Sequence, residues 1–83
     1  NWVYNRANVH LEKGLFSEAM AGYSRALDLN PRLAEAWQNR GVARLRQGDR
    51  EGAVADFEKA LEVAPENWSQ RAQVQSGLEK LRR

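Results

Sequence analysis

The sequence has 83 residues, among them no cysteine, one histidine and two prolines. Without cysteine the chain has no disulfide or thiolate chemistry, and a zinc site would depend on the single histidine. No apolar run reaches about 18 residues, so we expect no membrane-spanning segment. These absences predict a small soluble domain with no metal and no cofactor.

The sequence also lacks a strong charge of one sign, since 13 basic and 11 acidic residues give a net charge of +2. That balance does not by itself indicate nucleic acid or a membrane surface as a partner. No glycine-rich phosphate loop is present, because Gly14 and Gly48 are isolated. His10 has no obvious catalytic partner, and we expect it to pack or to be half exposed. We therefore predict that the chain is not an enzyme.

What the sequence does contain is an internal repeat. Pro31 and Pro65 stand 34 residues apart, and other residues recur at the same offset. A fixed period in this range is typical of stacked helical units, which usually bind other proteins. The nine identical pairs are Asn5/Asn39, Arg6/Arg40, Leu11/Leu45, Gly14/Gly48, Ala19/Ala53, Ala21/Ala55, Ala26/Ala60, Leu27/Leu61 and Pro31/Pro65.

Apolar residues recur with a helical period in each half of the chain. Gly14 and Gly48 predict helix ends, and Ser17 and Asp49 are expected to cap the helices that follow. Val74, Leu78 and Leu81 then predict a last, mostly polar helix that caps the stack. The expected helices are 1–13, 17–29, 34–47, 50–63 and 68–82.

With these residues in view, the chain resembles the tetratricopeptide repeat (TPR) family. The second repeat, 34–67, matches the family pattern of alternating small and large residues at the helix contacts. The first repeat, about 1–33, matches well only in its second half. The residues of the second repeat that carry the resemblance are Trp37, Gly41, Gly48, Ala53, Phe57, Ala60 and Pro65.

The resemblance implies an all-α fold, a right-handed α-solenoid of two helix–turn–helix units with a solvating C-terminal helix, 68–83. Because the chain starts without Met in the middle of the pattern, we expect it to be a fragment of a longer protein. Trp37 is expected in the core and Trp68 at a helix junction, whereas Trp2 should be exposed.

The resemblance also implies a concave groove, lined by the first helix of each unit, that binds a peptide or a helical segment of a partner protein. An asparagine at the centre of such a groove can bond the backbone of an extended peptide. The candidate groove residues are Tyr4, Asn5, Asn8, Leu11, Glu12, Glu35, Gln38, Asn39, Val42, Arg46 and Gln73.

Chaperone-binding members of the family hold a peptide carboxylate with a clamp of three cations and two asparagines. At the corresponding positions this chain has Tyr4, Asn8, Asn39, Ser69 and Gln73, so the asparagines match and all three cations are missing. A carboxylate would find no charge-assisted partner there. The sequence therefore argues against a carboxylate-clamp site.

Two alternatives to peptide binding stay open. Stacked repeats can self-associate through open ends, and the exposed end at Trp2 and Val3 allows a homodimer. RNA binding by a helical repeat is favoured by Arg40, Arg44 and Arg46 on one helix, but the 34-residue period argues against it. The partner and the compartment are not identified by the sequence, which is compatible with the cytoplasm or the plastid stroma.

Overall fold

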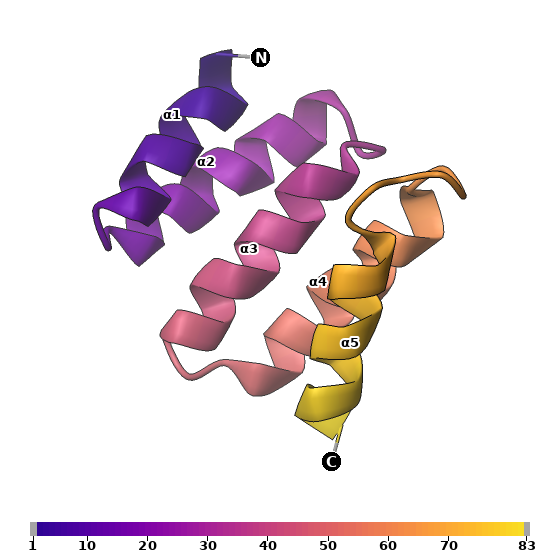
Figure 1. Cartoon of the computed structure of the whole chain (residues 1–83). Helices are drawn as coiled ribbons and strands as arrows, with labels where there is room; N and C mark the ends of the chain where they lie inside the picture. The colour runs from indigo at the N-terminus through magenta and orange to yellow at the C-terminus, as the bar shows by residue number, and fades with distance from the viewer. Residues whose placement is uncertain (1, 83) are drawn as a thin grey trace.

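The computed structural model describes residues 2–82, which form five α-helices and no β-strand within that range (Figure 1). The predicted all-α architecture is therefore confirmed. Residue 1, which was expected to start the first helix, lies outside the described residues. The helices are α1 (Trp2–Glu12), α2 (Phe16–Leu29), α3 (Ala34–Arg46), α4 (Arg50–Val63) and α5 (Arg71–Arg82).

Two glycines end the first helix of each pair. Gly14 and Gly48 have φ angles of 78° and 86°, in the left-handed region that only glycine adopts without steric cost. Asp49 caps α4 as predicted, because its carboxylate accepts a hydrogen bond of 2.9 Å from the backbone N–H of Gly52. The prediction for Ser17 was wrong: α2 starts at Phe16, and its N-cap residue is Leu15, which makes no side-chain hydrogen bond.

The last helix starts three residues later than predicted, at Arg71 instead of Trp68. The chain first turns, with the Trp68 N–H bonding the Pro65 carbonyl and the Arg71 N–H bonding the Trp68 carbonyl. The Arg71 guanidinium donates to the carbonyls of Ala64, at 2.9 Å, and Pro65, at 3.1 Å. Arg71 therefore satisfies the end of α4 and joins it to the start of α5.

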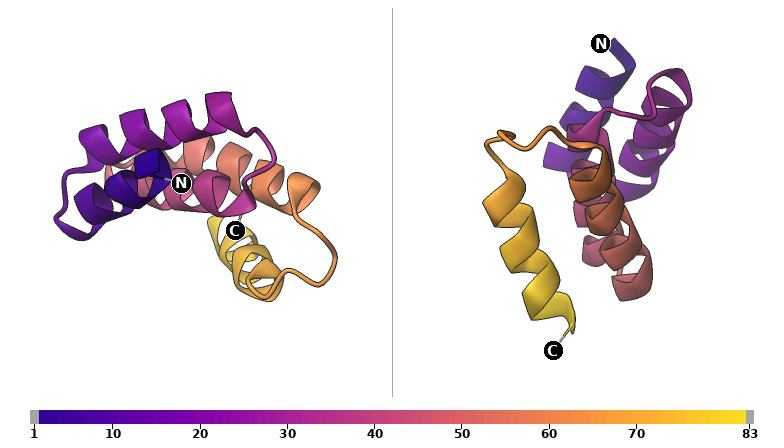
Figure 2. Two further views of the ribbon diagram at one scale, coloured as in Figure 1. Left: turned by 90° about the horizontal axis from the view of Figure 1, so that it is seen from above. Right: turned by 90° about the vertical axis from the view of Figure 1, so that its right-hand side faces the viewer.

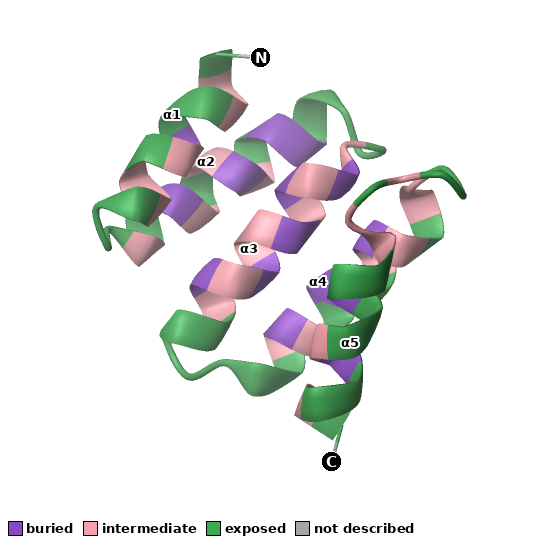
Figure 3. Cartoon of the chain, in the orientation of Figure 1, coloured by how far each residue is buried: buried purple, intermediate pink, exposed green. Residues whose placement is uncertain are grey.

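Each helix packs against the next one along the chain, and α1 also contacts α3. Figures 1 and 2 show the resulting arrangement, with α1, α3 and α5 on one side of the molecule and α2 and α4 on the other. The buried residues face inward between these two layers (Figure 3). The first helix of each pair and α5 thus share one surface, as the groove prediction requires.

A glycine allows the two helices of each pair to approach closely. It lies on the second helix, α2, in the first pair and on the first helix, α3, in the second pair. A Cβ atom at Gly41 on α3 would lie 2.9 Å from the Phe57 ring on α4, so Phe57 fills the gap that Gly41 leaves, as predicted. In the first pair the glycine is on the second helix: a Cβ atom at Gly22 would lie 2.8 Å from the Ala7 Cβ. The two pairs therefore reach close packing through different residues.

Candidate functional site

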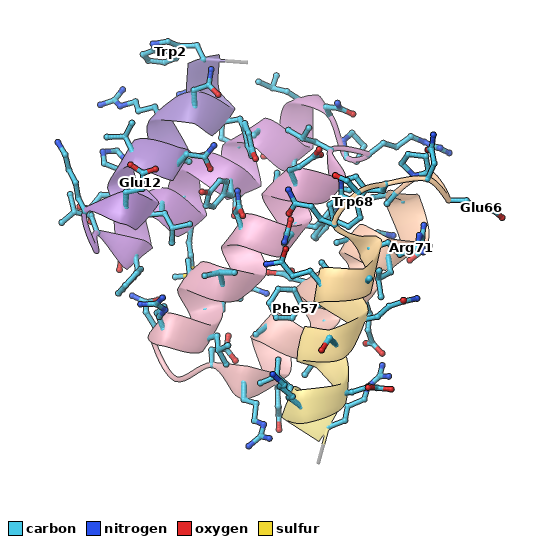
Figure 4. All side chains as sticks on the ribbon, viewed as in Figure 1. Trp2, Glu12, Phe57, Glu66, Trp68 and Arg71 are labelled. Carbon is cyan, nitrogen blue, oxygen red and sulfur yellow. The ribbon has the colours of Figure 1, made fainter. Side chains whose placement is uncertain are left out.

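The predicted groove residues belong to α1, α3 and α5, and Figure 4 shows one of them, Glu12, on α1. They differ in burial: Gln38 is only 7% exposed, whereas Asn5, Glu12, Arg46 and Gln73 are exposed. The other predicted residues, half buried, are Tyr4, Asn8, Leu11, Glu35, Asn39 and Val42.

Between α1 and α3 the polar side chains bond to one another. The Asn39 amide group donates to the Tyr4 hydroxyl and to Asn8 Oδ1, both at 3.1 Å, and the Tyr23 hydroxyl on α2 also donates to Asn8 Oδ1. The Nδ2 atom of Asn39 makes both of these contacts, so it is less available to bind a ligand than the sequence position indicated. Its carbonyl Oδ1 forms no hydrogen bond within residues 2–82 and remains able to accept one from a ligand.

Burial shifts the pKa of the two phenols in this network. It raises the pKa of Tyr23 well above its ordinary value, and the nearby Tyr4 phenol raises it further. Burial also raises the pKa of Tyr4. The two rings lie tilted against each other, with centroids 5.9 Å apart. The hydroxyls and amides of this network therefore carry no charge at physiological pH.

Between α3 and α5 the groove deepens into a hollow of about 330 Å³. Its wall is largely apolar, with Val42, Phe57 and Val74, and Gln38 adds an amide group that forms no hydrogen bond within residues 2–82. Figure 4 places Phe57 between the two helices. The remaining lining residues, all on α5, are Gln73, Ser76, Gly77 and Lys80.

The ends of the groove carry charged side chains. Glu35 accepts a hydrogen bond of 3.3 Å from the Trp68 indole, so it links α3 to the turn before α5. Trp68 packs against the second core cluster, which confirms its predicted place at a junction. Arg46 and Glu12, by contrast, form no ion pair within residues 2–82. They are the charges that a ligand could meet.

Sequence reasoning missed two features of this surface. Tyr23 on α2 was not among the predicted groove residues, but its hydroxyl reaches the groove network through Asn8. Phe57 and Val74 were not among them either, and both line the hollow. One sequence signal for the role of Tyr23 was available. Tyr23 and Phe57 occupy equivalent repeat positions, and only the tyrosine carries a hydroxyl group.

The described residues were also compared with what a metal site and a membrane-spanning helix require. Within residues 2–82 no group of three or more His, Cys, Asp and Glu side chains could hold a metal ion. None of the helices in that range is long and apolar enough to cross a membrane.

The family model for the tetratricopeptide repeat matches residues 7–81. The chain belongs to the tetratricopeptide repeat family. Tetratricopeptide repeat protein 36 of Bos taurus is 39% identical over 59 residues, which cover 71% of this chain and 31% of that protein. The human peptidyl-prolyl cis-trans isomerase FKBP4 is 34% identical over 79 residues, which cover 95% of this chain and 17% of that protein. The chain thus spans a minor part of these relatives.

Among solved structures, the TPR chain is similar to the first TPR of Spaghetti (RPAP3) bound to the HSP90 peptide SRMEEVD. The TM-score is 0.82 at 29% sequence identity, and the match covers 95% of this chain and 60% of that one. The fold is therefore the α-solenoid that the resemblance implied, and a TPR fold indicates a protein-interaction module.

Proposed function

We propose that this TPR domain binds a peptide or helical segment of a partner protein in the groove of α1, α3 and α5, anchored in the hollow between α3 and α5. The observation that carries the proposal is Gln38, which is 7% exposed, forms no hydrogen bond within residues 2–82 and lies beside an apolar hollow. Its amide is not among the enclosed polar atoms that lack a partner, so it reaches solvent and is open to the backbone of a ligand.

The hollow selects for an apolar side chain next to this backbone contact. Val42, Phe57 and Val74 provide the apolar wall, while Lys80 on α5 and Arg46 on α3 provide positive charge. Glu12 and Glu35 lower the net charge of the same surface. The ligand is therefore apolar at its anchor and mildly acidic beside it.

The carboxylate-clamp mode is not part of the proposal. The first TPR of Spaghetti (RPAP3) is bound to the HSP90 peptide SRMEEVD. In this chain the positions of the clamp cations hold Tyr4, Ser69 and Gln73, and the clamp asparagines Asn8 and Asn39 bond each other. SRMEEVD should therefore bind weakly, and amidation of its C-terminus should not change its affinity.

The contacts of the arginines favour protein over RNA as the partner. Arg40 and Arg44, two of the three arginines of α3, pair with the carboxylate of Asp56 at 2.8 and 3.3 Å. Paired in this way, they are not available to phosphate groups. Arg46 alone gives little of the positive surface that nucleic-acid binding needs.

The test is to select peptides of about 12 residues from a displayed random library and to map their binding by NMR. Arg46→Glu and Gln73→Glu should weaken binding of the selected peptides, because both changes add negative charge beside a mildly acidic ligand, and should leave the melting temperature unchanged, because both side chains are exposed. Lys59→Glu on α4 is the matched control, since Lys59 has only an exposed ion pair with Glu62. If Lys59→Glu abolishes binding and the groove variants do not, the interface is the α2–α4 side.

A further inference from the structure

A glycine stands in the interior of α5, at position 77. Within a helix, glycine is the least favourable residue after proline. The glycines with a positive φ angle are Gly14 and Gly48, so Gly77 has an ordinary helical backbone, which alanine would adopt equally well. The conformation of α5 therefore does not require glycine at this position.

Helix packing does not require Gly77 either. A Cβ atom built there would meet nothing within 4 Å in residues 2–82, apart from its chain neighbours and the backbone of its own helix. By contrast, a Cβ atom at Gly22, Gly41 or Gly52 would lie less than 3.0 Å from a neighbouring side chain. Gly77 thus weakens α5 without serving a turn or a helix contact in the described part of the chain.

The space beside Gly77 belongs to the hollow of about 330 Å³ between α3 and α5. Val74 and Leu78 on α5 are buried, and position 77 lies three residues after Val74, on the same face of the helix. Gly77 itself lines the hollow together with Val74 and Phe57. The side chain that is missing at position 77 therefore leaves its volume to the hollow.

This space differs from the surface on which one helix of a repeat packs against the next. The second pair shows that contact at Gly41 on α3, which faces the Phe57 ring of α4. The residue 34 positions after Gly41 is Gln75, which is exposed and does not line the hollow. A helix placed on α5 as α4 is placed on α3 would therefore contact the Gln75 side and leave the hollow open.

The size of the hollow and the side chains around it fit an aromatic ring. An apolar cavity of about 150 Å³ holds benzene, whereas a small branched aliphatic group would leave part of the hollow's wall without contact. The Phe57 ring in that wall offers a contact between two rings, which stabilises beyond the area that it buries.

The rim of the hollow adds a positive charge. Lys80 lines the hollow, is exposed and forms no ion pair within residues 2–82. Its ammonium group can pair with a carboxylate that lies next to the ring.

We propose that Gly77 determines the specificity of the groove: it keeps the hollow open for an aromatic side chain of the partner, and Lys80 pairs with an acidic residue beside that side chain. This inference rests on the proposed function, because it takes the groove of α1, α3 and α5 as the binding surface. It has an unusual consequence: Gly77→Ala should stabilise the fold and weaken binding.

Two blocked dipeptides, acetyl-Phe-Glu-amide and acetyl-Leu-Glu-amide, are the probes. Their apolar side chains are similarly hydrophobic but differ in shape. The NMR signals of the Val42 and Val74 methyl groups report on the hollow, because both side chains line it. We expect the Phe dipeptide to shift both signals with a dissociation constant about fivefold lower than that of the Leu dipeptide. Unchanged signals at about 10 mM Phe dipeptide would overturn the proposal.

Gly77→Ala is the central variant. It should raise the folding equilibrium constant about threefold to fivefold in urea denaturation, because alanine favours the helix. It should weaken the Phe dipeptide about tenfold and the Leu dipeptide less than about threefold, because the added methyl group takes space that the ring needs. A loss of stability would show that packing requires the glycine, and equal weakening of both dipeptides would show that the hollow does not select a ring. Either result overturns the proposal.

Three further variants provide the controls. Gln75→Ala, on the other side of α5, should change neither the binding of the dipeptides nor the stability by more than about twofold. Lys80→Glu should weaken the Phe dipeptide about threefold, and Lys59→Glu on α4 should leave it unchanged. Equal effects of the two lysine variants would overturn the pairing with Lys80.

The peptides selected from the displayed library separate this inference from the proposed function. Selected peptides that bind the groove through aliphatic side chains, with affinities that Gly77→Ala does not change, would overturn the inference and leave the proposed function intact. Selected peptides that bind the α2–α4 side would overturn the proposed function and this inference with it.

Discussion

In the first helix pair the central polar contacts join neutral groups, the hydroxyls of Tyr4 and Tyr23 and the amide of Asn8, and Asn39 of α3 joins them from the second pair. In the second pair they join ions, Asp56 with Arg40 and Arg44. The backbone plan repeats every 34 residues, but the polar chemistry does not. The comparison shows that the two pairs share their helix packing and differ in the polar groups that they use.

The same contrast divides the groove. Tyr4 and Asn8 on α1 correspond to Gln38 and Val42 on α3. The first two join a hydrogen-bond network, whereas the second two line a hollow. We therefore expect the proposed ligand to gain more at the α3–α5 end, where the Gln38 amide forms no hydrogen bond within residues 2–82.

The strongest way to break the second pair is Phe57→Ala. Phe57 is 7% exposed and joins α4 to α5 through Val74 and Leu78. Loss of the ring should lower the free energy of unfolding by about 3–5 kcal/mol, because Gly41 opposite it cannot fill the space. Chemical denaturation monitored by circular dichroism measures this. A loss below about 1 kcal/mol would mean that Phe57 is not a core residue.

Asp56→Ala should be the next largest effect. It leaves the Arg40 guanidinium, 15% exposed, without its carboxylate, and we expect a loss of about 3 kcal/mol. The matched control is Glu58→Ala, on the same helix, whose ion pair with Arg82 is exposed and should contribute less than about 1 kcal/mol. Similar losses for both variants would contradict the distinction between a buried and an exposed ion pair.

The helix caps offer a smaller comparison. Asp49→Ala removes the hydrogen bond to the Gly52 N–H and should lower stability by about 1 kcal/mol. At the equivalent position of the first pair, Leu15→Asp should raise stability by a similar or smaller amount, since Leu15 provides no cap. Ser17→Ala is the control and should have little effect because Ser17 is inside the helix. Thermal unfolding of the three variants measures the difference.

Tyr23→Phe makes the first pair resemble the second at this position and should have the smallest effect at neutral pH, about 1 kcal/mol. The clearest effect of this substitution should be on the stability of the protein at alkaline pH. Burial raises the pKa of Tyr23 in the folded protein, so the unfolded chain loses the phenol proton first, near its ordinary pKa of about 10.

The stability of the parent should therefore be fully present below about pH 10 and fall as the pH rises beyond it. Unfolding measured at several alkaline pH values should show a shallower fall in Tyr23→Phe, with Tyr4 accounting for part of what remains. Identical slopes for the two proteins would show that Tyr23 does not contribute to the alkaline loss.

The sequence by itself determined the helices, their order and the family. Gly14, Gly48 and Pro31 mark helix ends through local backbone chemistry, and the period of 34 places equivalent residues without any long-range information. The burial of Phe57 against Gly41 followed from the same pattern. The sequence indicated two helix starts less accurately. α2 begins at Phe16 instead of Ser17, and α5 begins at Arg71 instead of Trp68.

Only the tertiary structure decided how the polar side chains are used. Asn5 and Asn39 are equivalent in sequence, but Asn39 lies beside Tyr4 and Asn8 of the preceding pair, and Asn5 is exposed at the outer helix. Hydrogen bonds and ion pairs depend on distances of about 3 Å between residues far apart in the chain, which a repeat pattern does not specify. Likewise, the hollow lined by Trp2, Arg6 and Gly22 exists only because α1 packs against α2, which the repeat pattern does not specify.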